Sequence, residues 1–186
     1  KAPPGHSSLP PAVPGQQAIA QISRALVALD SQPMPASIGG VAGDMFDVLA
    51  PEIGGLQRVV LSNRWLFGPL LVRQLEQAGS TNALLRTTTA LTIVNAGNKD
   101  NVLPGRAEAV VNFRLAPGDS RQTVVEHVRR TIANEAIEVA PLPGGGEPSA
   151  VADTAAPSYQ AVNRTVREVF PGALVAPGLM LAGTDS

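Results

Sequence analysis

The stretches TTTALTIVN (residues 87–95) and AEAVVNFRL (residues 107–115) decide the fold of this 186-residue chain. The first stretch is rich in β-branched residues, which favour strands. In the second stretch, alternate positions fall on opposite faces of a strand. Its small and apolar face consists of Ala107, Ala109, Val111, Phe113 and Leu115. A polar loop over residues 96–101 connects the two stretches, so they predict an antiparallel hairpin with a long turn.

Helices are predicted on both sides of this hairpin. Before it, apolar residues recur at helical spacing between Ile19 and Leu29, and Pro33 follows them. After it, the turn at residues 117–120 provides an N-cap for a helix over 121–134, and a short strand follows over 137–142.

With an unseen strand before Gly5, this order predicts an α+β fold of the ferredoxin-like split β-α-β-β-α-β type. Such a fold has one four-stranded antiparallel sheet with its helices on one face. We expect residues 1–142 to form this domain.

An apolar helical insert, about residues 44–78, is larger than this fold needs and holds the single tryptophan, Trp65. We expect the helix to be interrupted near Gly68–Pro69. The apolar face of the insert suits a long acyl chain, and packing in a core explains it equally well.

The Gly- and Pro-rich residues 143–157 are expected to be a linker. Residues 158–186 are expected to be a helix and two short buried strands, Leu174–Val175 and Leu179–Leu181, from an α/β domain. The chain starts without Met and stops abruptly, so it is expected to be an excerpt of a longer protein.

The composition argues against several classes of function. The chain has 14 basic and 15 acidic residues, so its net charge of −1 gives no reason to expect nucleic-acid binding. An aromatic content of 3 % also argues against a base-stacking RNA-binding sheet. No apolar run approaches the roughly 20 residues of a membrane span. The absence of cysteine excludes disulfides, thiolate metal sites and a cysteine nucleophile, and leaves the compartment open.

Three residues could carry chemistry, and each also has an ordinary structural interpretation. His6 lies in a polar loop and can donate to an oxyanion or transfer a proton, although a loop histidine can simply be exposed. Asn101 ends the hairpin turn, where asparagine usually caps backbone groups. Arg114 lies on a strand and suits bidentate capture of a carboxylate, although an exposed sheet arginine fits too. His127, within a predicted helix, is expected to be structural or a surface residue.

Other motifs do not indicate a catalytic, phosphate-binding or metal-binding site. Ser7 and Ser8 lie beside His6, but the chain has no G-x-S-x-G elbow, and neighbours in sequence do not make a catalytic triad. Gly144–Gly146 lacks the Lys-Ser/Thr of a phosphate loop. No group of residues has metal-ligand spacing.

Several stretches, taken in order, resemble one family of zinc-dependent enzymes. They are Gly5-His6-Ser7-Ser8 with Pro10-Pro11, residues 65–69 (WLFGP), residues 82–89 (NALLRTTT), residues 101–104 (NVLP), residues 111–114 (VNFR), and residues 170–186. The chain resembles the zinc carboxypeptidase family of carboxypeptidase S, the N-acyl-amino-acid hydrolases, aminoacylase, acetylornithine deacetylase and succinyl-diaminopimelate desuccinylase. The carboxypeptidase S branch is the most similar. Ala182 stands where the family usually has glycine.

The resemblance implies an enzyme with a catalytic domain and an inserted lid domain that forms a homodimer. In such enzymes two zinc ions activate water, which hydrolyses an amide bond beside a free carboxylate of an N-acyl amino acid or peptide. The metal ligands and general base of the family match no residue of this chain. The chain alone is therefore expected to hold no zinc and to be inactive.

The resemblance also implies roles for four residues. His6 would stabilise the oxyanion in the partner subunit's active site. Asn101 and Arg114 would bind the substrate's carboxylate region, and the backbone N–H of Gly183 would contact substrate. An alternative remains open: a non-catalytic dimerisation module from a family member that has lost its metal ligands. A generic domain binding RNA or a small effector is the third possibility, and the composition argues against RNA.

Overall fold

A computed structural model describes residues 1–180 of the chain, which group into two compact units. The first unit contains residues 1–34, 87–115 and 119–147. The second contains residues 35–86 and 116–118, together with the residues from 148 onward. The first unit contains both helices and strands, and the described elements of the second unit are helices.

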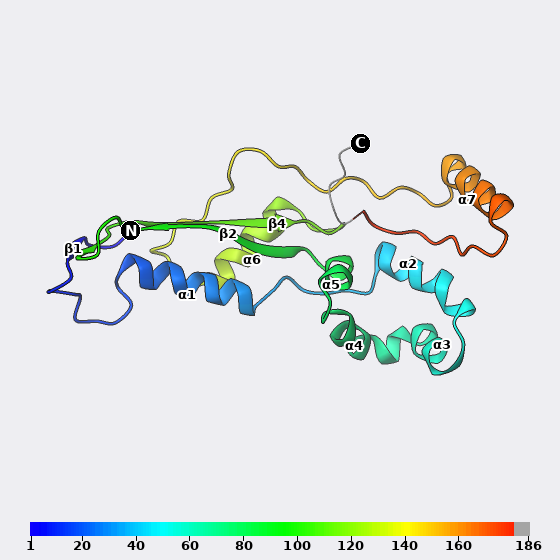
Figure 1. The fold of residues 1–186 in the computed structure, drawn as a ribbon, viewed down its shortest axis with the longest axis horizontal. Helices are drawn as coiled ribbons and strands as arrows, with labels where there is room; N and C mark the ends of the chain where they lie inside the picture. The colour runs from blue at the N-terminus through cyan, green and yellow to red at the C-terminus, as the bar shows by residue number, and fades with distance from the viewer. Residues whose placement is uncertain (181–186) are drawn as a thin grey trace. The chain divides into compact units, whose positions relative to one another are not determined.

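The predicted hairpin is confirmed (Figure 1). Strand β2 (Thr88–Ala96) pairs antiparallel with β4 (Ala107–Arg114), in a register that runs from Thr88 opposite Arg114 to Ala96 opposite Ala107. A bulge lies between Leu91 and Ile93. Thr92 is the extra residue, and its hydroxyl donates to the carbonyl of Val110 at 3.1 Å, which holds the bulge in place.

Helices α1 (Ala18–Ser31) and α6 (Arg121–Ile132) pack against each other and against the hairpin. The core consists of Leu29, Met34, Val124 and Val128, with the half-buried Val111, Phe113, Leu115, Ile132 and Val139 against it. The predicted inward face of β4 is therefore confirmed. In α1, however, the buried residues are Ala18, Ala25 and Leu29, whereas Ile19 is exposed. Two small alanines thus occupy the positions where the helix is closest to its neighbours.

The N-terminus of α6 is capped as predicted. Ser120 and Thr123 form a capping box, in which each side chain bonds to the other's backbone N–H.

A second, very short sheet forms inside the long turn. Strand β1 (Gly5–His6) pairs antiparallel with β3 (Val102–Leu103), with Gly5 opposite Leu103 and His6 opposite Val102. The N-terminal loop is thereby attached to the end of the hairpin that lies away from the core.

The prediction of one four-stranded sheet is wrong for the described residues, which form two sheets of two strands each. Residues 137–142 form no ladder. Pro141 has no N–H to donate, and arginines of α6 occupy carbonyls of the segment. Arg129 donates to the carbonyl of Val139 at 3.1 Å, and Arg121 donates to that of Leu142 at 3.4 Å.

The second unit contains most of the helices. They are α2 (Gly40–Leu49), the 3₁₀ turn Ala50–Glu52, α3 (Gly55–Ser62), α4 (Arg64–Leu75), α5 (Gly79–Leu85) and α7 (Pro157–Val169). The expected interruption at Gly68–Pro69 is wrong, because α4 continues through Pro69. The chain breaks at Asn63 instead, where the side-chain amide donates to the carbonyl of Val59 at 2.8 Å.

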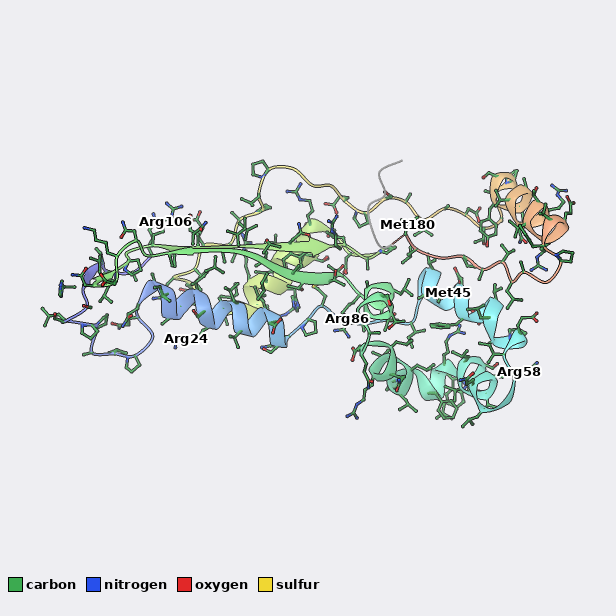
Figure 2. All side chains as sticks on the ribbon, in the orientation of Figure 1. Arg24, Met45, Arg58, Arg86, Arg106 and Met180 are labelled. Atoms are coloured by element: carbon green, nitrogen blue, oxygen red, sulfur yellow. The ribbon has the colours of Figure 1, made fainter. Side chains whose placement is uncertain are left out.

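Buried charge holds the end of α5 in this unit. The guanidinium of Arg86 is only 7 % exposed and pairs with Glu76 just after α4 (Figure 2). Burial lowers the pKa of Arg86 from its usual value.

The C-terminal expectations hold in part. Helix α7 forms where residues 158–170 predicted a helix, but none of its residues is buried. Residues 174–175 and 179–180 form no strand, since a strand needs a ladder partner and the described residues provide none. Leu181 lies outside the described residues.

One buried hydrogen bond ties the hairpin to α6. Thr87 is fully buried, and its hydroxyl donates to the carboxylate of Asp119 in the turn before the helix. We predict that Thr87→Val, which keeps the shape but removes the donor, lowers the free energy of unfolding by about 1–3 kcal/mol. Urea denaturation would measure this. Thr87→Ser keeps the hydroxyl and should lose less, and an unchanged midpoint for Thr87→Val would contradict the assigned role.

Candidate functional site

The structure brings two of the predicted site residues together, although they are 95 positions apart in sequence. Pairing of β1 with β3 places His6 beside Asn101, and the backbone N–H of Ser7 donates to the Asn101 carbonyl at 3.0 Å. The Asn101 amide nitrogen then lies 3.5 Å from Nε2 of His6. Both side chains are exposed, so this pair, here called the tip pair, can reach a ligand or another protein.

The other ring nitrogen of His6 faces its own loop. Its Nδ1 lies 2.8 Å from the Ser8 hydroxyl oxygen and accepts the Ser8 backbone N–H at 3.2 Å. The sequence showed Ser8 beside His6 but did not predict this contact. The signal was the spacing, since a side chain at i can turn back on the backbone N–H at i+2.

Arg114 does not join the tip pair. It ends β4 at the position opposite Thr88, whereas the tip pair lies beyond Ala107 at the other end of the strand. Seven residue steps along a strand span about 23 Å, so at least about 20 Å separates the two. The Arg114 side chain is exposed and has no partner among residues 1–180. Arg106, at the tip-pair end of β4 (Figure 2), instead pairs with Glu108.

His127 has a structural role, as the sequence suggested. It is 8 % exposed, and its Nε2 lies 3.0 Å from the carbonyl of Gln32 just after α1. Only a ring N–H can bond to a carbonyl oxygen, so this contact fastens α6 to the end of α1.

Gly183 lies outside the described residues, so the structure does not place it. Among the residues that the structure does describe, no cluster of three or more His, Asp or Glu side chains could hold a metal ion. Within the same range, no helix is long and apolar enough to cross a membrane.

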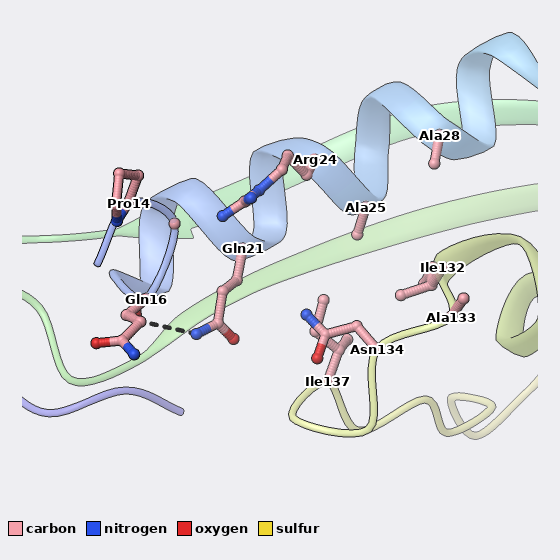
Figure 3. A pocket seen from close by; sticks show the side chains of 11 residues that line it. Pro14, Gln16, Gln21, Arg24, Ala25, Ala28, Ile132, Ala133, Asn134 and Ile137 are labelled. Carbon is pink, nitrogen blue, oxygen red and sulfur yellow. Dashed lines mark hydrogen bonds between the residues drawn. The ribbon is translucent and has the colours of Figure 1, made fainter.

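A groove of about 460 Å³ lies in the first unit, between α1 and the turn after α6 (Figure 3). Its walls include Gln21, Arg24 and Ala25 from α1 and Asn134 from the turn. The guanidinium of Arg24 occupies the space where a side chain at Gly15 would lie, and Gly15 has a φ of +86°. A glycine is therefore required there. None of the predicted site residues lines this groove.

The ionisable groups with shifted pKa values, Asp47, Arg64 and Arg86, lie in the second unit. The hydrogen bond from Arg64 holds the pKa of Asp47 below its usual value. Asp47 is largely exposed, so this pair contributes little to stability.

Comparison with known proteins identifies the relatives of the chain. The peptidase dimerisation domain family of M20 enzymes matches residues 1–140. The chain is 40 % identical to the N-fatty-acyl-amino acid synthase/hydrolase PM20D1 of Xenopus tropicalis, over 98 % of this chain and 35 % of that protein. It is 38 % identical to the probable carboxypeptidase S-like 2 of Dictyostelium discoideum, over 98 % of this chain and 34 % of that protein. The chain therefore spans about a third of the length of these relatives.

A solved structure supports the fold. An M20 family metallo-carboxypeptidase, Sso-CP2 from Sulfolobus solfataricus, matches with a TM-score of 0.55 at 17 % identity. The match covers 94 % of this chain and 47 % of that one.

Proposed function

Because the chain belongs to the M20 peptidase dimerisation domain family, we propose that it is the lid of a zinc-dependent hydrolase. In this proposal residues 1–142 form the lid, about 44–78 are its helical insert, and residues 158–186 belong to the catalytic domain. The full-length enzyme cleaves the amide bond of an N-acyl amino acid or peptide next to its free carboxylate. Two relatives, an N-fatty-acyl-amino acid synthase/hydrolase and a probable carboxypeptidase S-like protein, support this substrate class.

The single observation that carries the proposal is the tip pair. His6 and Asn101 come from distant segments and place an imidazole and an amide side by side on an exposed tip. Imidazole and amide N–H groups are the donors that stabilise the negative oxygen formed when water attacks an amide. We therefore assign His6 to oxyanion stabilisation and Asn101 to the adjacent carboxylate region.

The distance from the tip pair to Arg114 supports a site built by two subunits. The scissile amide and the free carboxylate of an N-acyl amino acid are only a few ångströms apart, whereas about 20 Å or more separates His6 from Arg114 along the hairpin. One lid cannot place both groups on one substrate. In the proposed homodimer, Arg114 grips the carboxylate in the site of its own subunit, and His6 reaches the site of the partner. A contact between the backbone N–H of Gly183 and substrate is included in the proposal only because the family resemblance implies it.

The register of β1 supports a wider sheet in the longer protein. Residues 2–6 run antiparallel to residues 102–105. If the same pairing continued, residues before Lys1 would lie opposite the residues of β4. A strand preceding Lys1 would thus pair with β4 and widen the sheet. Exposed Leu91, Ile93 and Val94 on β2 offer an apolar edge for self-association.

Zinc has no place among the described residues, because they hold no cluster of ligands. In the proposed enzyme the metal ligands and the general base belong to parts of the protein outside this chain. The residues of this chain orient substrate and stabilise charge.

The helical insert offers a surface for the acyl group. Trp65, Leu66, Pro69 and Leu70 fall on one side of α4, and Trp65 is 82 % exposed. Soluble proteins seldom leave so continuous an apolar helix face to water. We assign this face to contact with the acyl tail of the substrate.

The first prediction tests the proposed reaction in the full-length protein. With zinc present, it should hydrolyse members of a panel of N-acyl amino acids and dipeptides, and His6→Ala should lower kcat/KM by about 10²–10³-fold. His6→Gln keeps an N–H donor and should lose less. If His6→Ala stays near normal, the assignment of His6 is wrong. If the zinc-loaded wild type is inert on the whole panel, the non-catalytic dimerisation module becomes the better interpretation.

The second prediction tests the two-subunit site with hybrid dimers. We expect His6→Ala and Arg114→Ala homodimers both to be impaired. A hybrid of one His6→Ala subunit and one Arg114→Ala subunit has one intact site, so it should regain about half of the wild-type activity. Differently tagged subunits, co-expressed and purified through both tags, would provide this dimer. A hybrid as weak as its parents would show that both residues act in the same site from one chain.

The third prediction concerns the α4 face. The double variant Trp65→Ser/Leu70→Ser should lower kcat/KM about tenfold for long-chain acyl substrates and leave acetyl substrates unchanged, because only a long tail buries area there. Val162→Ser on α7, an equally exposed apolar position, is the matched control. An equal loss for all acyl lengths would contradict an acyl-binding role.

A further inference from the structure

We propose that Ser8 is a positioning residue that holds His6 in the tautomer with its hydrogen on Nε2. The structural part of this inference rests on the contacts of the ring alone. Its catalytic consequence rests on the function proposed above.

Two donors of Ser8, its backbone N–H and its hydroxyl, together favour one tautomer of His6. An amide N–H can only donate, and it lies 3.2 Å from Nδ1 of His6 in hydrogen-bonding geometry. Nδ1 therefore accepts this bond, which disfavours a hydrogen on Nδ1 in the neutral ring. The Ser8 hydroxyl, with its oxygen 2.8 Å from the same nitrogen, can rotate to donate as well.

The neutral imidazole then has its single hydrogen on Nε2, the edge that faces Asn101. As the amide is oriented, its nitrogen lies 3.5 Å from Nε2, so two donors stand side by side. Two donors cannot bond to each other, and both are left to bind an external acceptor such as an oxyanion. The opposite tautomer would present a lone pair to that acceptor and repel it.

Ser8 and His6 lie in the same short loop, so the tautomer of His6 depends on contacts within that loop. Ser8 is two residues from His6, and the loop is fixed by further backbone bonds, from Leu9 N–H to the His6 carbonyl and from Ser7 N–H to the Asn101 carbonyl, both at 3.0 Å. The ring is thus oriented within each subunit before any partner or substrate arrives.

The first test is ¹⁵N NMR of the 186-residue chain, which has only two histidines. At a pH where both rings are neutral, long-range ¹H–¹⁵N correlations report which nitrogen carries the hydrogen. His127, whose Nε2 lies 3.0 Å from the Gln32 carbonyl, provides an internal reference for the Nε2–H form. We expect His6 to be in the Nε2–H form in the wild type.

Ser8→Ala should raise the Nδ1–H fraction of His6 several-fold and leave His127 unchanged. Ser8→Thr keeps the hydroxyl and should behave as wild type. Ser7→Ala removes the neighbouring hydroxyl, which is not among the contacts of the ring, and is the matched control. A His6 ring that is Nδ1–H in the wild type, or that is unaffected by Ser8→Ala, would overturn the proposal.

The second test uses the full-length protein. Loss of one hydrogen bond to the ring should lower kcat on the order of tenfold in Ser8→Ala with little change in KM, and Ser8→Thr should restore it. An unchanged kcat in Ser8→Ala, beside an inactive His6→Ala, would refute the positioning role. Full activity of His6→Ala would instead refute the proposed function, while the tautomer would still be decided by NMR.

Discussion

The antiparallel ladder between β2 and β4 is the constraint on which the first unit depends. Its inner face packs against α1 and α6, and four buried side chains, Leu29, Met34, Val124 and Val128, form the centre of that contact. Burial of each side chain contributes about 1.5–3 kcal/mol to the free energy of unfolding. The buried bond from Thr87 to Asp119 fixes where the ladder begins relative to α6. Because these contacts gather at one end, the other end of the ribbon is free to carry the tip.

The length of the same ladder separates the proposed functional groups. Arg114 lies at the packed end and the tip pair lies at the free end, so the strand acts as a spacer of fixed length. A rigid spacer of this kind is useful only where the two ends serve different sites. In the proposed homodimer, this spacing would let each copy reach toward the site of the other.

The sequence predicted the parts of the fold that local pattern controls. Alternation over Ala107–Leu115 and the cap at Ser120 predicted β4 and α6, because those signals depend only on neighbouring residues. The sequence did not predict the structure correctly where hydrogen bonds between distant segments determine whether a strand forms. Residues 137–142 have strand-like composition, yet arginines of α6 take their carbonyls, and Leu174–Val175 has no ladder partner among the described residues. The site was predicted as separate residues, because only the β1–β3 register shows that His6 meets Asn101 and that Arg114 does not.

The tip pair also shows how few residues are needed to place a histidine ring beside an amide. In the proposal above, the backbone N–H and hydroxyl of Ser8, two residues away, favour the Nε2–H form of His6, and the adjacent amide is brought in by a two-residue strand. Neither contact uses the apolar core. Loops that carry function usually gain precision from the scaffold beneath them. Here the scaffold supplies the position of the tip, whereas the chemistry of the donors is determined within the loop itself. Changes elsewhere in the first unit can therefore alter the position of these groups without altering which atoms they can bind.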